Sequence, residues 1–489
     1  DRELFSRFRW RFVVVPPLVF LAYFPLYTYH FDLYRLIILC WATWHGLMQL
    51  YGFIRIYDAK VGSVSRATAN WDWLVCLFGF ITPQLFRPDK LADILSHWGA
   101  AGGPLAPSGA LQAIRWALLG MTAVAVLGFA VNYVIQWRRG PAPNPLKLLM
   151  LVSGIGTWWL AMYYIENLII GLALFDICHD VQYLAIVWLY NCRRVGSNAE
   201  LGRFMKYVFR RGMVLLYLGL VTAYGAIALV GPLVTDGTVS RIFYGILFTS
   251  TILHYYYDGF IWKVRESSNQ AGLGLSTIAA GRVQQIVMGR YAHLLKWSPA
   301  IVVLGLLFAL DFLDPSLTTA RKEELDQLYA GSLMQRTELP AAEDERSWLL
   351  SHFNQLQHIA AAVPDAHMTQ LRSSMMLANF GRHDEAIHRL DRLLETDPHD
   401  YEARAAVADI HLRRGSLDLA GRHFLAALDD ARTPEERAIV HLKLGEIALY
   451  RQDAAGAKSR FQAAQRENPE LGALVEALEK RSDRGNSSP

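Results

Sequence analysis

Charged residues are scarce in this chain. Only 19% of its 489 residues are Asp, Glu, Lys or Arg, whereas 53% are hydrophobic and 12% aromatic. A soluble domain usually has about a quarter charged residues, so the composition excludes an ordinary soluble enzyme of this length. The scarcity is also uneven, because long apolar stretches fill residues 12 to 313 while residues 314 to 489 are charged and rich in alanine.

Cysteine is scarce as well. Cys40, Cys76, Cys178 and Cys192 all lie in or beside apolar stretches, and no two have CxxC spacing. This pattern argues against a disulfide framework and against a cysteine-based zinc or redox site. The net charge of +4 does not indicate a nucleic-acid partner, because the basic residues cluster in short loops between apolar stretches, as they do in membrane proteins.

The apolar stretches predict an all-α, polytopic membrane bundle. A helix needs about 20 mostly apolar residues to cross the hydrocarbon core. Nine stretches come close to that length, at residues 12–29, 34–53, 71–87, 111–136, 146–164, 168–190, 213–235, 242–262 and 298–313. We therefore expect about nine spans within residues 1–313, surrounded by membrane lipid.

The distribution of basic residues predicts the orientation of the bundle. With the N-terminus in the cytoplasm, most Lys and Arg residues of residues 1–313 fall in cytoplasmic segments. The outside segments then carry only Arg35, Arg87, Lys90, Arg115 and Arg241. This bias is the one that the positive-inside rule describes. With nine spans the C-terminal region lies outside, which in the inner membrane of a bacterium means the periplasm.

A repeat of about 34 residues follows in residues 367–469 and is typical of helix-turn-helix arrays. Small residues recur at Ala386, Ala420 and Ala457, larger ones four positions later at Leu390, Phe424 and Phe461, and prolines at Pro398, Pro434 and Pro469. Gly381 and Gly415 occupy turn positions, and Leu444-Gly445 matches the first-helix pair of the third repeat. The first two repeats depart from that pair, with Ser373-Ser374 and Val407-Ala408.

On these residues the C-terminal region resembles tetratricopeptide repeats. The resemblance implies a stack of helix pairs with a concave surface for a protein or peptide partner. The alternative is a helical domain that packs only on its own membrane part. We expect a transmembrane domain in residues 1–313, a linker with leading helices in 314–366, repeats in 367–480 and a disordered tail in 481–489.

Three histidines lie deep inside predicted spans, where polar side chains are costly and usually functional. His45, His179 and His254 each come 11 or 12 residues after the start of a span that runs from outside to inside. At 1.5 Å per residue they are expected at nearly one depth. Two other histidines are expected near the outer face. His30 is expected at the headgroups, and His97, in the outside loop of residues 88–110, is expected on the surface or, alternatively, in a re-entrant segment.

Polar companions lie about one helical turn from these histidines on the same helix face. They are Gln49 after His45, Gln182 after His179, Asp258 after His254, and Asp176 one turn before His179. Imidazole is the commonest transition-metal ligand, and a second side chain usually orients it. The pattern predicts a metal centre with His45, His179, His254, Asp176 and Asp258 as ligand candidates, and with Gln49, Gln182 and Asp258 as orienting or catalytic residues.

Several occupants remain open at this point. Iron is the expected metal, and copper and zinc are alternatives. Haem would use two of the histidines as axial ligands, but two histidines about 14 residues apart on one helix, its usual membrane signature, are absent. The HxxxH and HxxHH boxes of the membrane fatty-acid desaturases are also absent.

Two functions of different classes fit the sequence. The first is a membrane metalloenzyme, an iron-dependent oxidoreductase or oxygenase that acts on a lipid-soluble substrate. The second is a lipid-linked glycosyltransferase or an assembly scaffold without a catalytic metal. Sugar transferases of that kind carry acidic residues in the first outside loop, and here that loop offers only His30 and Asp32.

Overall fold

The computed structural model is built of helices, and no strand occurs in the part of the chain that it describes. That part comprises residues 2–63, 65–140, 142–165, 167–197, 201–229, 233–234, 236–261, 298, 302–310, 317–331, 339–472, 474–476 and 478. The predicted all-α class is confirmed. The predicted tail at residues 481–489 lies outside the described residues. The chain divides into two compact units, Asp1–Thr319 and Ala320–Pro489.

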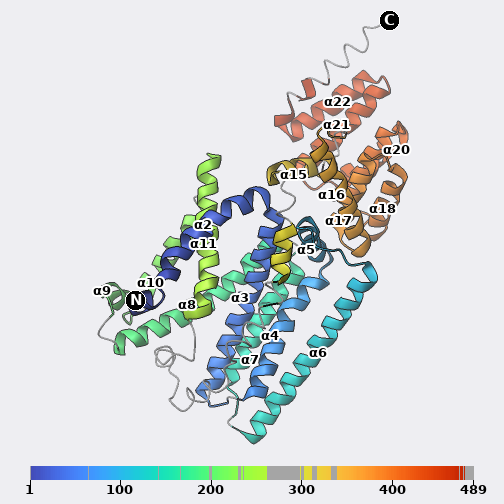
Figure 1. The fold of residues 1–489 in the computed structure, drawn as a ribbon. Helices are drawn as coiled ribbons and strands as arrows, with labels where there is room; N and C mark the ends of the chain where they lie inside the picture. Colours follow the sequence, from blue (N-terminus) through green and yellow to red (C-terminus); the bar gives the residue numbers. More distant parts are fainter. Residues whose placement is uncertain are drawn as a thin grey trace. The chain divides into compact units, whose positions relative to one another are not determined.

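The first unit contains long helices joined by short connections (Figure 1). They are α1 (Arg2–Arg7), α2 (Arg9–Tyr29), α3 (Phe31–Lys60), α4 (Arg66–Phe86), α5 (Pro88–Ala100), α6 (Ser108–Arg139), α7 (Pro145–Trp159), the π-helical turn η1 (Leu160–Tyr164), α8 (Leu168–Ser197), α9 (Arg203–Val208), α10 (Val214–Gly225), η2 (Ala226–Leu229) and α11 (Gly237–Ile261).

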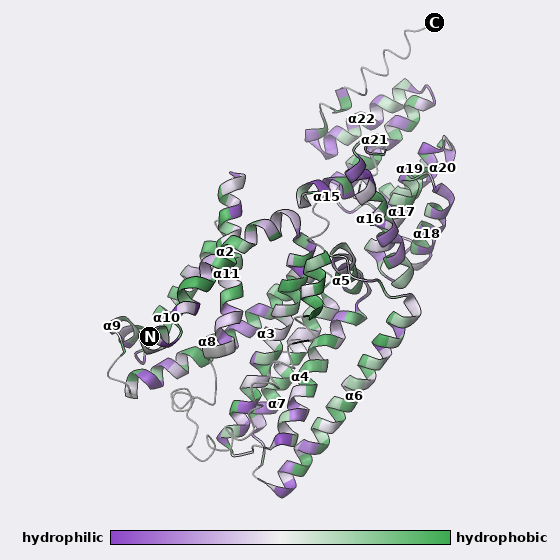
Figure 2. Ribbon diagram, in the orientation of Figure 1, coloured by the Kyte–Doolittle hydropathy of each residue, from purple (hydrophilic) through white to green (hydrophobic). Residues whose placement is uncertain are grey.

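Five helices in the described part are long and apolar enough to cross a membrane, at Arg9–Tyr29, Phe31–Lys60, Ser108–Arg139, Pro145–Tyr164 and Ile170–Gly196. They fall on the predicted spans 12–29, 34–53, 111–136, 146–164 and 168–190. Many of their apolar side chains are exposed in the described part of the unit: on α6, for example, Val124 and Leu127 are 62% and 66% exposed. Figure 2 shows this apolar character along α6 and α7. Such surfaces are typical of membrane helices.

The remaining four predicted spans stay predictions. Residues 71–87 fall on α4, and residues 242–262 fall largely on α11, whose last described residue is Ile261. The span at 213–235 contains α10, a shorter apolar helix, and then runs partly outside the described residues. For the span at 298–313, only residues 298 and 302–310 are described.

Helices α3, α4, α7 and α8 form the core around which the candidate site is built. Leu47 and Leu50 of α3 pack there with Phe80 of α4 and Trp158 of α7, all nearly fully buried. The Trp158 indole donates a hydrogen bond to the Phe80 carbonyl at 2.8 Å, so even the polar atom of this large side chain is satisfied. Figure 1 shows α3, α4 and α7 running side by side.

A glycine lets α3 approach α8 closely beside the first of the predicted histidines. A Cβ added to Gly46 would lie 2.9 Å from the Phe175 ring of α8 and 3.1 Å from the Phe80 ring of α4. Any larger residue would therefore push these rings away. The absence of a side chain at Gly46 lets His45 lie close to α8.

Helix α11 packs on α2 mainly through aromatic rings. Phe248 lies 5.5 Å from Tyr23 between ring centroids, and Tyr257 lies 4.8 Å from Phe12. Gly245 again permits the approach, because a Cβ there would come within 2.9 Å of the Tyr23 ring. The α2 helix contains Pro16, Pro17 and Pro25, which membrane helices tolerate better than soluble ones.

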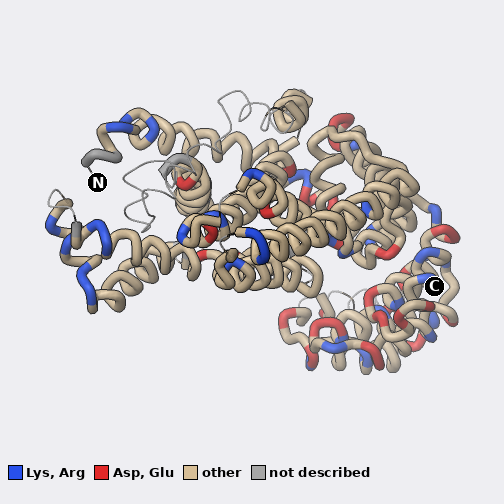
Figure 3. The backbone as a smooth tube through the Cα atoms, turned by 90° about the horizontal axis from the view of Figure 1, so that it is seen from below, with Lys and Arg blue, Asp and Glu red and all other residues tan. Residues whose placement is uncertain are grey.

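The second unit is a series of antiparallel helices in which charged residues are dense, in contrast to the long helices of the first unit (Figure 3). Its elements are α15 (Thr319–Asp326), η4 (Gln327–Gly331), α16 (Glu343–Ala362), α17 (His367–Asn379), α18 (His383–Thr396), α19 (Tyr401–Arg413), α20 (Leu417–Asp430), α21 (Pro434–Tyr450), α22 (Ala454–Glu467) and η5 (Pro469–Leu471).

Small buried residues and local signals for helix ends and starts explain the three helix pairs α17–α18, α19–α20 and α21–α22. Ala386, Ala420 and Ala457 are at most 1% exposed. Gly381 and Gly415 have positive φ angles in the turns of the first two pairs. Thr433 and Glu436 form a capping box that starts α21, with Pro434 in its first turn. The identification of the three helix pairs as tetratricopeptide repeats stays a prediction.

Candidate metal centre

The three histidines predicted at one depth lie together. His45 comes from α3, His179 from α8 and His254 from α11, and one ring nitrogen of each lies within 4.8 Å of the others. His45 and His179 are each 7% exposed. Three helices that are distant in sequence thus bring their imidazoles to one point.

The closest pair is His45 and His254. Their Nε2 atoms are 3.2 Å apart, and their ring centroids 4.9 Å apart. Two neutral imidazoles can meet in this way if one donates a hydrogen bond to the other. A metal ion bound tetrahedrally at about 2.0–2.1 Å by two imidazole nitrogens holds those nitrogens about 3.3 Å apart. The observed distance therefore fits a shared metal as well as a hydrogen bond.

Asp258 lies beside this pair. Its Oδ2 is 3.6 Å from His254 Nε2 and 3.9 Å from His45 Nε2, while its Oδ1 accepts a hydrogen bond from the Tyr183 hydroxyl at 3.0 Å. The carboxylate is thus held from the α8 side by Tyr183. It is close enough to the two nitrogens to act as a further ligand or to accept a proton from an imidazole N–H.

His179 supplies an unsatisfied ring nitrogen. Its Nε2 is buried and has no hydrogen-bond partner among the residues that the structure describes. The Gln49 amide nitrogen donates to the His179 main-chain carbonyl at 3.2 Å, and Gln49 Oε1 is buried without a partner within the same described part. Buried polar atoms without partners are rare and need an explanation. A metal ion at the three histidines would satisfy the nitrogen of His179.

Aromatic rings enclose the three imidazoles. Tyr255 stacks on His45 at 4.6 Å between centroids, Phe175 lies 5.5 Å from His179, and Tyr183 lies 5.0 Å from His254. These contacts limit the rotation of each imidazole. The ring positions are therefore fixed by packing before any ligand binds.

The polar companions behave differently from one another. Asp258 points to the imidazoles, whereas Gln49 contacts the main chain of His179 and Gln182 lines a small cavity beside His179. Neither Asp176 nor Asp258 belongs to the group of side chains that converge within 4.8 Å in the described part, which consists of the three histidines.

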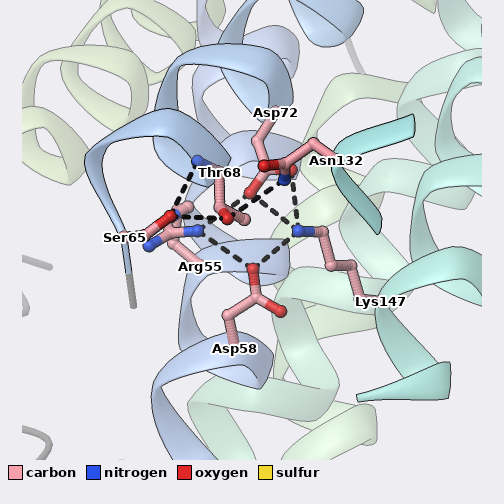
Figure 4. A network of polar contacts seen from close by, with 7 residues as sticks. All are labelled: Arg55, Asp58, Ser65, Thr68, Asp72, Asn132 and Lys147. Atoms are coloured by element: carbon pink, nitrogen blue, oxygen red, sulfur yellow. Dashed lines mark hydrogen bonds and ion pairs between the residues drawn. The ribbon is translucent and has the colours of Figure 1, made fainter. Parts of the chain in front are cut away.

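Sequence reasoning missed a second buried polar cluster, which we term the charge quartet: Arg55 and Asp58 on α3, Asp72 on α4 and Lys147 on α7 (Figure 4). Lys147 Nζ lies 2.6 Å from Asp58 Oδ2 and 2.7 Å from Asp72 Oδ1. Arg55 Nη1 lies 2.9 Å from Oδ2 of both carboxylates. The side chains of the two aspartates are 0% exposed, and that of Lys147 is 1% exposed.

A signal for the charge quartet was present in the sequence. Asp72 falls inside the predicted span 71–87, and an acidic residue there calls for a partner. Lys147 lies at the start of the predicted span 146–164, where the positive-inside rule counts it among the cytoplasmic basic residues. The rule describes where Lys and Arg lie along the chain, but it does not give the direction of the side chain.

The expectations for His30 and His97 are wrong. His30 is 5% exposed and so does not face headgroups. His97 lies 2.6 Å from Asp32 through Nδ1, and its Nε2 accepts a hydrogen bond from Arg35 at 2.9 Å. The reason is that α5 packs against α3, which partly covers a segment that the sequence predicts as a surface loop.

Comparison of the chain with protein-family models, with curated proteins and with solved structures found no match.

Proposed function

We propose that this chain is an integral membrane metalloenzyme in which His45, His179 and His254 bind one iron ion. The observation that carries the proposal is the convergence of three imidazoles from three helices, one of them with an unpartnered buried Nε2. Helix packing alone would not require three histidines at one point. A donor set of three imidazole nitrogens and a neighbouring carboxylate suits iron, copper or zinc.

The neighbouring residues have distinct roles in this proposal. Asp258 completes the ligand set or orients an imidazole, since it lies within 3.9 Å of both His45 and His254. Gln49 holds the main chain of α8 at His179, and Gln182 faces the cavity. The iron would supply electron exchange and Lewis acidity to a bound substrate.

Haem fits the site less well than a single metal ion. Two axial ligands on opposite sides of one haem iron are about 4 Å apart, at about 2.0 Å from the metal on each side. The Nε2 atoms of His45 and His254 are only 3.2 Å apart. Their close ring contacts also leave no layer between them for a porphyrin.

The proposed substrate is lipid-soluble. On α8, Ile177 and Val181 lie two positions before and two positions after His179. Each is 63% exposed and would face the hydrocarbon. The metal centre therefore lies one helix thickness from lipid. An oxidoreductase at this position would receive its substrate from the membrane.

We also propose the wider organisation that the sequence predicts: about nine spans, a cytoplasmic N-terminus, and a tetratricopeptide-like domain outside the cytoplasm that binds a protein or peptide. The basic-residue bias supports the orientation. The three helix pairs with buried alanines at the repeat positions support the domain assignment.

Metal analysis of the purified full-length chain tests the metal centre. We expect about one iron per chain in the wild type, and loss of iron in each of His45→Ala, His179→Ala and His254→Ala, because removal of any one ligand disables the unit. His97→Ala is the matched control, since it removes a half-buried, ion-paired imidazole elsewhere in the same unit. A wild type that folds and contains no stoichiometric metal would leave the transferase or scaffold function as the better one.

A further inference from the structure

Basic residues gather where the chain turns from α8 through α9 into α10. We term this group the basic turn: Arg193, Arg194, Arg203, Lys206, Arg210 and Arg211. Only one acidic residue, Glu200, occurs in the same stretch of sequence. In Figure 3 blue segments follow the chain around this turn, at the left of the view. The turn comes directly after Ile170–Gly196, one of the helices long and apolar enough to cross a membrane. It is therefore expected at the boundary between the hydrocarbon and water.

Packing brings the two ends of the basic turn together. The Phe209 ring lies 5.6 Å from that of Trp188 in α8, between centroids. The Cys192 thiol donates a hydrogen bond to the Phe209 carbonyl at 3.1 Å. Cys192 directly precedes Arg193, and Phe209 directly precedes Arg210, so the main chains at the two arginine pairs lie close together. Four positive charges are thus placed at one level by two separate segments.

The charge of the basic turn is not neutralised by the part of the protein that the structure describes. Arg203, Arg210 and Arg211 are exposed, and within that part none of the three forms an ion pair with an acidic side chain. Like charges at short range repel one another, and an anion between them removes the repulsion. The surface therefore favours a negatively charged partner.

Aromatic and apolar side chains next to the basic turn indicate the kind of anion. Phe204 and Tyr207 of α9 are each more than half exposed. Leu189, one helical turn deeper in α8 than the first arginine pair, and Leu215, at the start of α10, are also more than half exposed. A soluble anion would not contact these side chains. Basic residues with aromatic side chains beside them and apolar ones beneath are typical of a membrane interface.

We propose that the basic turn binds the headgroup of an acidic phospholipid. The guanidinium group matches the phosphate in shape and charge. In phosphatidylcholine the choline cation offsets the phosphate, whereas in phosphatidylglycerol the negative charge is uncompensated and is available to the arginines. Phe204 and Tyr207 then lie at the level of the headgroup, and the exposed leucines contact the acyl chains. This site is separate from the three histidines and requires no metal.

Two exposed arginine pairs provide matched variants. Arg210→Gln with Arg211→Gln removes two charges from the basic turn. Arg138→Gln with Arg139→Gln removes the same two charges from the end of α6, where both side chains are also exposed. The distribution of basic residues predicts the same side of the membrane for both pairs. Only the first double variant changes the proposed site.

The probe is phosphatidylglycerol, added to the delipidated full-length protein in a neutral detergent, with bound lipid counted by native mass spectrometry. We expect the wild type to bind it more tightly than phosphatidylcholine. Arg210→Gln with Arg211→Gln should bind it at least about tenfold more weakly, because each basic residue near a membrane surface contributes about fivefold in affinity. Arg138→Gln with Arg139→Gln should match the wild type.

Several outcomes would overturn the lipid site. Equal weakening in the two double variants would mean that any exposed basic residue on that side suffices. Equal affinity of the wild type for the two lipids would favour an acidic partner protein instead. Displacement of the lipid by inorganic phosphate, but not by sodium chloride of equal ionic strength, would indicate a site for a soluble anion. If the first double variant does not fold, unchanged affinity in Arg203→Gln with Phe204→Ser overturns the proposal. Iron content does not enter any of these outcomes, so the metal function is tested separately.

Discussion

Between the Nε2 atoms of His45 and His254 there is room for one proton or one metal ion. In the first case one imidazole donates to the other and Asp258 has no direct role, although its Oδ2 lies within 3.9 Å of both nitrogens. In the second case both nitrogens give their lone pairs to the metal and the carboxylate balances its charge. The second case gives Asp258 a role at the cation, in addition to the hydrogen bond that it accepts from Tyr183.

Asp258→Asn tests this role. The substitution keeps the size of the side chain and removes its negative charge, so we expect the affinity for iron to fall about 10- to 100-fold, as for other side chains that support a metal site. Competition with a chelator measures the affinity. Asp180→Asn is the control, because Asp180 is an exposed carboxylate on α8, next in sequence to a ligand. Equal affinities in the wild type and Asp258→Asn would exclude this carboxylate from the metal centre.

At the scale of helices, the charge quartet joins α3, α4 and α7. Arg55 and Asp58 lie on α3, the helix that also carries His45 and Gln49. Asn132 of α6 joins the same region by donating to Thr68 of α4 at 3.1 Å. The quartet is neutral as a whole, so its charges compensate one another in a region with little water. Removal of one charge leaves the opposite charge buried.

Lys147→Met should therefore destabilise the first unit strongly, by about 3–5 kcal/mol, because two buried carboxylates would share only Arg55. The double variant Lys147→Met with Asp72→Asn restores the charge balance and should recover much of that loss. Thermal unfolding in detergent measures both. Losses that simply add in the double variant would show that the four residues do not act as a unit.

Helix positions in this chain follow from the sequence, but the directions of several side chains do not. The depth of His45, His179 and His254 follows from their distance to the span starts, and the structure brings them together. The partner of Gln49 depends instead on how α3 crosses α8, and it is a main-chain carbonyl. The charge quartet likewise depends on the rotation of α7 about its axis, which hydropathy does not determine.

At the scale of the whole molecule, the two units differ in the kind of side chain at their surfaces. The first exposes apolar side chains along its helices, and the second is joined by ion pairs between successive helices, such as His399 and Arg404 with Asp430. Burial acts to raise the pKa of Asp430, but the hydrogen bonds from His399 and Arg404 outweigh it and lower the pKa. The stability of the second unit should therefore depend on pH.

The second unit should lose stability as the pH falls from 7 to 5. Burial, with help from neighbouring cations, lowers the pKa of His411, His423 and His441. A histidine whose pKa is lower in the folded state than in the unfolded state contributes its full stability above the unfolded pKa of about 6.5. That contribution is lost as the pH falls, because the unfolded state binds the proton more readily than the folded state. Hydrogen exchange of α19–α22 in the full chain, corrected for intrinsic rates, measures this. His423→Gln should weaken the pH dependence, and protection equal at pH 7 and 5 would contradict it.

The last prediction concerns the path of the chain across the membrane. The distribution of basic residues predicts an N-terminus in the cytoplasm, and nine spans would then leave the second unit outside. A reporter active only in the cytoplasm should be silent when fused after Glu479 and active when fused after Lys60 or Arg139, which end α3 and α6. Activity at all three positions would mean an even number of spans. Because activity after both Lys60 and Arg139 leaves the spans between them paired, the span that drops out would then be the one at 213–235, 242–262 or 298–313. Silence after Lys60 would mean that the first two spans have the opposite orientation to the predicted one. The helix that carries His45 would then run from inside to outside.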